Sequence, residues 1–229
     1  MTSNYTLITE LTLSRAELDK LLKGRTSPIR FERCVFDGED LSRMDLRGCV
    51  FLRCSALGTT FTRAQLNDSE WLACKAGGAD FGLADLTDSR FQDSDLNNTE
   101  WTRALLAAAV FDGVKLTGAS FSEVRGLGLA FSNSLLVGVD LRGMSFRKQR
   151  LTGLDFSTAD LGGCDFRDAF FEGGSLRDAN LKNTRFEGAD LRQVTLGALT
   201  MDYLSCFKRA TISYEQAAML ATGIGMLVV

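Results

Sequence analysis

Cysteine is the residue whose type and spacing could most readily support chemistry in this chain of 229 residues. Three of the six cysteines, Cys34, Cys54 and Cys74, follow one another at intervals of 20 residues, a spacing that could align thiols for a metal ion or for redox exchange. Side chains that point the same way in register, however, suit neither a tetrahedral metal site nor relaxed disulfide geometry. We therefore expect small buried apolar side chains here, with no metal and no cofactor.

Other catalytic chemistry has little support in the sequence. Histidine is absent, which removes the commonest general base and a frequent metal ligand. Glycines recur at a spacing of five rather than in a phosphate-binding loop, and paired carboxylates need a cleft before their pKa values shift. We expect no catalytic residues and no enzymatic activity.

Composition limits the partners. The chain has 26 basic and 29 acidic residues, a net charge of −3, whereas a sequence-independent nucleic-acid binder needs a basic excess. The first ten residues, MTSNYTLITE, have neither the basic region nor the apolar run of a secretory signal, and no segment has the length of a membrane span. We expect a cytoplasmic protein that binds neither nucleic acid nor membrane.

The elements that position these residues follow a period of five. From Phe31 to Met201 every fifth residue is large and apolar, except Ala56, Ala76 and Gly126. We call this the core position. The residue two before it is small in most repeats, and the residue two after it is Gly in 13 of the 35 repeats and Asn or Asp in eight more. Those three residue types tolerate the positive φ of a tight corner.

A period of five fits neither a helix nor a flat strand. We predict a square coil in which each repeat makes one face, so that residues 20 apart stack in parallel with backbone hydrogen bonds about 4.8 Å apart. The fold class is then all-β, a quadrilateral parallel β-helix of roughly nine coils and on the order of 40 Å. Gly126 leaves its core position empty, and we expect a local bulge there with Leu127 and Leu129 filling the space.

The pattern A(D/N)Lxx in GADFGLADLTDSRFQDSDLNNTEW and TADLGGCDFRDAFFEGGSLRDANLKNTRFEGADL resembles the pentapeptide-repeat family. That resemblance covers about residues 29–206 and implies a right-handed coil. The final stretch, ATISYEQAAMLATGIGMLVV, is similar to the C-terminal end of the Qnr and MfpA quinolone-resistance branch, as are SALGTTF and CKAGGADF. The narrower resemblance implies a homodimeric DNA mimic that binds DNA gyrase or topoisomerase IV and protects it from quinolones or a topoisomerase-poison toxin. The alternative is a scaffolding β-helix that binds an unrelated protein.

Acidic residues concentrate in the middle of the repeats. Residues 64–123 hold ten acids and four bases. This excess is either an ordinary solvated surface or an acidic patch that meets a basic DNA-binding surface. On the second interpretation, the partner-binding residues are Asp68, Asp80, Asp85, Asp88, Asp95, Glu100 and Glu123.

The segments at the two ends of the chain are predicted to cap the first and last coils. In residues 1–28, Ser14 and Glu17 form a capping box and Gly24 suits the end of a helix over 14–23. In residues 207–229, a helix over 213–222 begins at Ser213 and precedes an apolar tail, which should not remain exposed. We expect this segment to cap the last coil and form the dimer interface. Its predicted interface residues are Tyr214, Ala218, Ala221, Ile224, Met226 and Val228.

Overall fold

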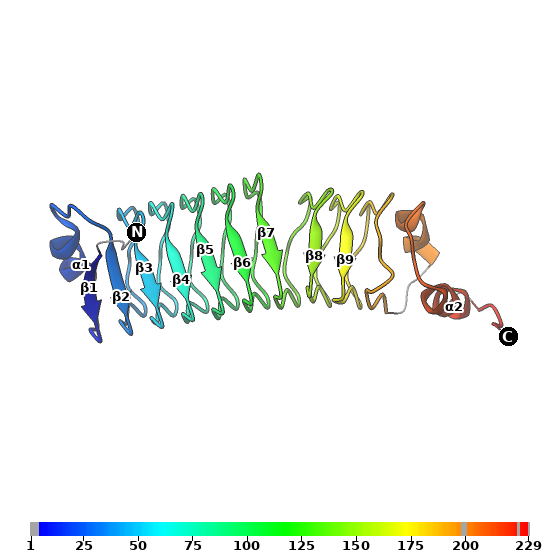
Figure 1. The fold of residues 1–229 in the computed structure, drawn as a ribbon, viewed down its shortest axis with the longest axis horizontal. Coiled ribbons are helices and arrows are strands. Elements are labelled where there is room, and N and C mark those ends of the chain that lie inside the picture. The colour runs from blue at the N-terminus through cyan, green and yellow to red at the C-terminus, as the bar shows by residue number, and fades with distance from the viewer. Residues whose placement is uncertain (1–4, 198–200, 224, 229) are drawn as a thin grey trace. The chain divides into compact units, whose positions relative to one another are not determined.

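A computed structural model describes residues 5–197, 201–223 and 225–228. The chain folds as a right-handed quadrilateral parallel β-solenoid of about eight turns with two short helices, which confirms the predicted fold class (Figure 1). Contacts divide it into two compact units, Met1–Phe131 and Ser132–Val229, which we describe in turn.

The helices and strands are short, as five-residue faces require. The strands are β1 (Thr6–Thr9), β2 (Ile29–Glu32), β3 (Val50–Leu52), β4 (Glu70–Leu72), β5 (Arg90–Gln92), β6 (Val110–Asp112), β7 (Ala130–Ser132), β8 (Arg150–Thr152) and β9 (Phe170–Glu172). The helices are α1 (Arg15–Leu22), the 3₁₀ helix η1 (Met201–Phe207) and α2 (Tyr214–Gly223).

The strands of the first unit stack in parallel at the predicted interval. Phe31 pairs with Phe51, Phe51 with Trp71, and Trp71 with Phe91. We number the four faces of each coil in chain order from this one. The other three faces are joined by isolated bridges with the same spacing, such as Asp80 to Glu100 on the third face and Asp85 to Leu105 on the fourth. In this unit core positions and the positions two residues before them are buried, as the pattern predicts, except for the half-buried Glu39, Val124 and Gly126.

The residue at each corner has a left-handed backbone conformation, whatever its type. All positions two after a core position from Arg33 to Gly188 have φ between 49° and 77°. Arg, Ala, Leu, Glu, Lys and Thr occupy this conformation beside the expected Gly, Asn and Asp, although it costs other residues about 1–2 kcal/mol. The stacked coils on either side hold these corners in place.

Aromatic rings fill the first unit. The predicted column on the first face is observed, and its rings stack with centroids 4.0 Å apart at Phe51 and Trp71 and 4.8 Å apart at Phe91 and Phe111. A second column on the third face contains Phe61, Phe81, Trp101 and Phe121. Edge-to-face contacts, such as that of Trp71 with Phe81 at 5.8 Å, join the two columns into one core.

Gly126 differs in part from expectation. The corner keeps its regular hydrogen bond, from the N–H of Leu129 to the carbonyl of Gly126 at 3.0 Å, and Arg125 keeps its bridge to Leu105. Leu129 is buried and fills the space, since a Cβ added at Gly126 would lie 3.0 Å from Leu129 Cδ2. The expectation for Leu127 is wrong, because its side chain is 90% exposed. One leucine is enough to replace the missing core side chain.

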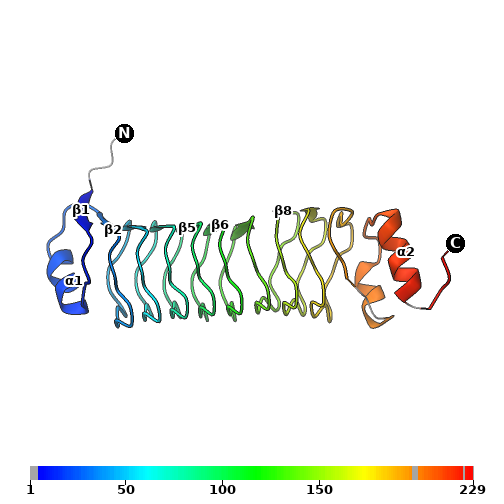
Figure 2. The ribbon, with the colours of Figure 1, turned by 90° about the horizontal axis from the view of Figure 1, so that it is seen from below.

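The N-terminal segment forms a modified coil over the first unit (Figure 2). β1 pairs in parallel with β2, an element that the sequence did not predict, and Thr12 bridges to Val35. α1 follows with Leu18 buried, and its capping box between Ser14 and Glu17 is confirmed. The main-chain N–H of Arg15 donates to the Glu39 carboxylate at 2.9 Å, so an acidic residue at an inward position serves the helix N-terminus.

The second unit stacks its rings on the fourth face instead. Phe146, Phe166, Phe186 and Phe207 follow one another with centroids 4.9–5.1 Å apart. The interval is 20 residues until the last step, which is 21, and Asp190 likewise bridges to Thr211. Cys206, at a core position by strict counting, is therefore only half-buried, because Phe207 takes its place.

α2 is joined to the last coil through Gln216. Ser213 and Gln216 form a capping box, in which the N–H of Ser213 donates to Gln216 Oε1 at 2.6 Å and the N–H of Gln216 donates to Ser213 Oγ at 3.2 Å. The buried amide of Gln216 also donates to the carbonyls of Leu191 at 2.7 Å and Val194 at 2.6 Å. Gln216 thus satisfies carbonyls that the next coil would otherwise bind.

Candidate functional site: an acidic surface on the first unit

Three of the predicted partner-binding acids serve the fold. Asp80, Asp85 and Asp95 directly precede core positions and are half-buried. Each accepts a hydrogen bond from the backbone N–H two residues on, at 2.7, 3.1 and 3.2 Å respectively. This Asx turn supports the corner. Because these carboxylates are tied to the main chain, we expect that reversing the charge of Asp80 or Asp85 would disturb the turn.

Three other acids are available to a partner. Asp68 and Asp88 lie at exposed left-handed corners of the fourth face, with φ of 60° and 58°. Within the described residues neither forms an ion pair. Glu100 is exposed on the third face, where Thr102 Oγ1 donates to it at 3.3 Å. These side chains contribute charge to the surface without serving a turn.

Glu123 is neutralised within the chain. Arg103 Nε donates to its carboxylate at 2.6 Å, and this hydrogen bond lowers the pKa of Glu123. The structure thus brings the seven predicted acids onto one unit but separates them into three roles: turn support, exposed charge and internal ion pair.

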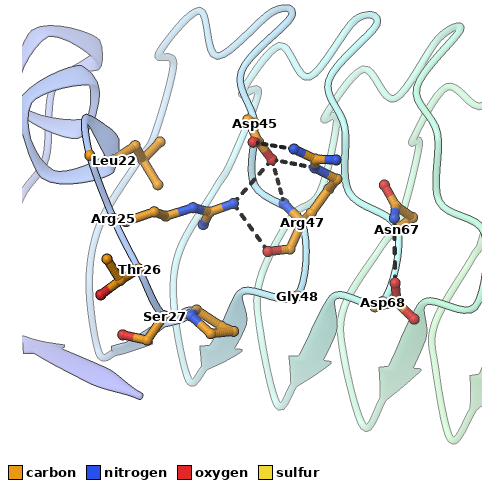
Figure 3. Close-up of a pocket in the computed structure, with 11 residues that line it drawn as sticks. Leu22, Arg25, Thr26, Ser27, Asp45, Arg47, Gly48, Asn67 and Asp68 are labelled. Atoms are coloured by element: carbon orange, nitrogen blue, oxygen red, sulfur yellow. Dashed lines mark hydrogen bonds and ion pairs between the residues drawn. The ribbon is translucent and has the colours of Figure 1, made fainter. Parts of the chain in front are cut away.

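Outside residues 64–123 four turn-supporting aspartates pair with an arginine two residues later, whereas Asp40, Asp155 and Asp160 are followed by serine or glycine. Arg47 binds Asp45 through Nε at 2.8 Å and Nη2 at 2.7 Å (Figure 3). The Arg47 hydrogen bonds, aided by Arg25, lower the pKa of Asp45 to about 2. The same pairing of a turn aspartate with the residue two later joins Asp140 to Arg142, Asp165 to Arg167, and Asp190 to Arg192.

The pocket of Figure 3 is built from such a pair. It has a volume of about 600 Å³ and is lined by Leu22, by residues 24–28 and by Asp45, Arg47, Gly48, Asn67 and Asp68. Arg25 crosses it, with Nη2 3.0 Å from Asp45 and 3.2 Å from the carbonyl of Arg47. These contacts tether the segment after α1 to the coils, which is a structural role.

The described ranges provide no site for metal chemistry. In residues 5–197, 201–223 and 225–228 no group of three His, Cys, Asp or Glu side chains is placed to hold a metal ion. The aligned cysteines are buried, and Cys54 and Cys74 direct their thiols at main-chain carbonyls of the coil before, at 3.5 and 3.2 Å. No helix of the described chain is long and apolar enough to cross a bilayer.

The C-terminal segment exposes apolar side chains. Tyr214 is 78% exposed, and Met226 and Leu227 are 59% and 95% exposed. Val228 is exposed, whereas Ala218 and Ala221 are half-buried. Ile224 lies outside the described residues.

The repeat and its geometry agree with known families. The pentapeptide repeat region matches residues 28–101, and the model of pentapeptide repeats in eight copies matches residues 84–122, 130–163 and 159–197. The chain belongs to the pentapeptide-repeat family. No curated protein sequence matches this pentapeptide-repeat protein.

Solved structures share the fold at low identity. A trypsin-treated form of QnrB1, a plasmid-mediated fluoroquinolone resistance protein, is 20% identical with a TM-score of 0.59, and the match covers 98% of both chains. A second trypsin-treated form is 18% identical with a TM-score of 0.53, covering 99% of this chain and 100% of the other. HetL, a pentapeptide-repeat protein involved in heterocyst differentiation regulation from the cyanobacterium Nostoc, is 20% identical with a TM-score of 0.43 over 82% of this chain and 86% of its own.

Two features of the site escaped the sequence analysis. The Asx turns were missed because alternation shows which side chains leave the core but not which fold back onto the main chain. The aspartate–arginine pairs were missed although they have a signal, the triplet D-(L/F)-R at residues 45–47, 140–142, 165–167 and 190–192.

Proposed function

We propose that this pentapeptide-repeat protein is a DNA mimic that binds a type II topoisomerase, DNA gyrase or topoisomerase IV, and protects it from quinolones or a topoisomerase-poison toxin in the cytoplasm. The observation that carries the proposal is the concentration of charge. Residues 64–123 have a net charge of −6, whereas the whole chain has −3, so the remainder is slightly basic. The acidic stretch lies entirely within the first unit.

The charge density approaches that of DNA. Residues 64–123 make three coils of 20 residues, which span about 14 Å at roughly 4.8 Å per coil. Six net negative charges then give about one per 2.4 Å, compared with about one per 1.7 Å along duplex DNA. A basic surface that binds phosphates would meet a similar field here.

Likeness to QnrB1 supports the same partner. The match extends over nearly the full length of both chains, and QnrB1 is by its description a fluoroquinolone resistance protein. The C-terminal segment, with Gln216 closing the last coil, corresponds to the ending whose resemblance to Qnr and MfpA implies this partner.

We further propose that the C-terminal tail forms a homodimer. Met226, Leu227 and Val228 are exposed and apolar, a combination that favours burial against a second copy. A two-fold dimer would present two acidic surfaces to a two-fold enzyme. Replacing Met226 and Leu227 with Glu removes the apolar surface but keeps the Gln216 cap, so sedimentation should show monomers with an unchanged melting temperature. A dimer that survives both substitutions would place the interface elsewhere.

The deciding experiment adds the purified protein to DNA gyrase. We expect it to inhibit supercoiling at high concentration, to compete with DNA for the enzyme, and to reduce ciprofloxacin-stabilised DNA cleavage at lower concentration. Competition should weaken with salt, because exposed charges are screened over about 10 Å at 0.1 M. If the protein neither binds gyrase or topoisomerase IV nor changes cleavage, the scaffolding alternative replaces this proposal.

A further inference from the structure

A notch on the third face of the first unit marks a missing side chain. It has a volume of about 330 Å³ and is lined by Thr62, Asp80, Gly82, Leu83, Glu100, Thr102 and Arg103. The residues directly after the core positions of this face are Ser42, Thr62, Gly82, Thr102 and Ser122. Gly82 alone among them lacks a side chain, so it forms a floor between two threonines.

Two stacked carboxylates border the notch. Asp80 bridges to Glu100 in the next coil, so their like charges lie one coil apart. Asp80 accepts from the N–H of Gly82 at 2.7 Å and from Thr62 Oγ1 at 2.9 Å. Glu100 accepts from Thr102 Oγ1 at 3.3 Å. A carboxylate has about four acceptor positions, so both retain capacity for a cationic donor.

The other walls favour a long basic side chain. Leu83 is 41% exposed on the rim and offers an apolar surface to a methylene stem. Arg103 also borders the notch, but its Nε donates to Glu123 at 2.6 Å, so its charge is already matched. The notch thus combines an apolar wall with two acids.

The second unit shows the same arrangement with the side chain present. Asp140 and Asp160 stack on its third face as Asp80 and Glu100 do, and Arg142 stands where Gly82 does. The Arg142 guanidinium binds Asp140 through Nη2 at 2.6 Å and approaches Asp160 with Nε at 3.7 Å. The position after a turn acid on this face can therefore hold a guanidinium between two stacked carboxylates.

We propose that the Gly82 notch binds an arginine side chain of the protein partner, in the place that Arg142 occupies within the second unit. The planar guanidinium can bridge two carboxylates, which an ammonium does less well. The identification of that partner as a type II topoisomerase rests on the proposed function, but the binding of arginine by the notch does not.

The first test needs no partner. The ¹⁵N-labelled full-length protein is titrated with N-acetyl-arginine amide, and amide shifts are followed by NMR. We expect shifts centred on Gly82, Leu83 and Thr102. Gly82→Thr, which fills the notch without changing charge, should abolish them. Its turn has a precedent in Asp85 and Thr87, whose Oγ1 donates to the aspartate at 2.8 Å.

Gly162→Thr is the matched control. Gly162 also follows a turn aspartate on a third face, and its N–H donates to Asp160 at 3.0 Å. This variant should keep the Gly82-centred shifts. If Gly82→Thr does not fold, Gly82→Arg serves instead, since it should recreate the Arg142 arrangement and occupy the notch from within. Shifts that persist in the folded Gly82 variants, or that spread equally over all surface acids, would overturn the proposal.

The second test uses DNA gyrase. Gly82→Thr should weaken binding about tenfold, in the range of a side chain that anchors an interface, and Gly162→Thr should not. If wild type binds arginine at the notch but does not bind gyrase, the proposed function fails and the notch stands. If wild type and Gly82→Thr bind gyrase with equal affinity, gyrase does not use the notch, and the proposal that the notch binds an arginine of this partner is wrong.

Discussion

Neutralising the corner acids Asp68 and Asp88 should weaken gyrase binding without affecting the fold. Both side chains are exposed at left-handed corners, where asparagine is tolerated as well as aspartate. Asp68→Asn with Asp88→Asn therefore removes two charges and little else. Reversal of Asp80 or Asp85 would be a poorer test, because those carboxylates hold backbone N–H groups at 2.7 and 3.1 Å.

The size of the effect follows from the charge. Removing two of six net charges lowers the density from about one per 2.4 Å to about one per 3.6 Å over the same three coils. Exposed ion pairs contribute about 0.2–1 kcal/mol each, so losing two should cost about 1 kcal/mol, or roughly a fivefold increase in Kd. The loss should fall mainly on the association rate, because surface charges steer the encounter.

Surface plasmon resonance with immobilised gyrase at 50, 100 and 200 mM salt measures both quantities. We expect the double variant to bind more weakly at low salt and to depend less on salt than wild type. Asp178→Asn is the control, since Asp178 is a left-handed corner aspartate, φ 56°, in the second unit. Equal Kd values for wild type and the double variant at all three salt concentrations would remove the corner acids from the mechanism. An equal loss in the control would show that net charge matters and position does not.

Three further predictions concern stability. Trp71→Ala should lower the free energy of unfolding, measured by chemical denaturation, by about 4 kcal/mol, because the buried indole stacks on Phe51 and Phe91. A loss below about 1 kcal/mol would contradict the close-packed aromatic column. Gly174→Ala should cost at least about 3 kcal/mol in thermal unfolding, because its φ is +90° and a Cβ would collide with the Leu154 carbonyl. The neighbouring Gly173→Ala, which has open space around it, should cost only about 1 kcal/mol. Similar losses for the two variants would refute the collision. The pKa of Asp45 is lowered to about 2, so its ion pair contributes stability above the ordinary aspartate pKa near 3.9, and this stability is lost as the pH falls through 2. Allowing for solvent screening, Asp45→Asn should remove about 1 kcal/mol of stability at pH 7 and flatten the dependence of the melting temperature on acid pH. A variant whose melting temperature follows the wild-type pH profile would exclude Asp45 as the source of that dependence.

The fold follows from the sequence because burial repeats every five residues. Phe31, Phe51 and Trp71 are predicted to stack and do so, since no helix or flat strand places such residues on one side. The periodicity does not reach the ends. β1 is four residues with little apolar patterning, and it forms because β2 offers it a free edge. The extra residue before Thr211 is likewise invisible to a fixed count.

The sequence predicts the excess of acidic residues on this surface, but it does not predict which of them support turns and which are exposed. Asp80 and Asp88 look alike in sequence, yet the first closes a turn and the second is exposed charge. The difference is positional: an aspartate before the core position reaches the backbone N–H two residues later, whereas a corner aspartate does not. That rule separates Asp80, Asp85 and Asp95 from Asp68 and Asp88.

The same turn explains how one fold acquires a local charge. The Asx turn needs an aspartate or asparagine oxygen before the core position but uses only the main chain of the residue two positions later, so that later residue can vary without loss of the turn. Where it is arginine, as at residues 45–47 and 140–142, the aspartate is neutralised. Where it is glycine, threonine or asparagine, as at residues 80–82, 85–87 and 95–97, the negative charge remains. The turn aspartates of residues 64–123 lack the arginine that neutralises Asp45, Asp140, Asp165 and Asp190, which adds to the acidity of this stretch, and at the Gly82 notch that absence also leaves a cavity.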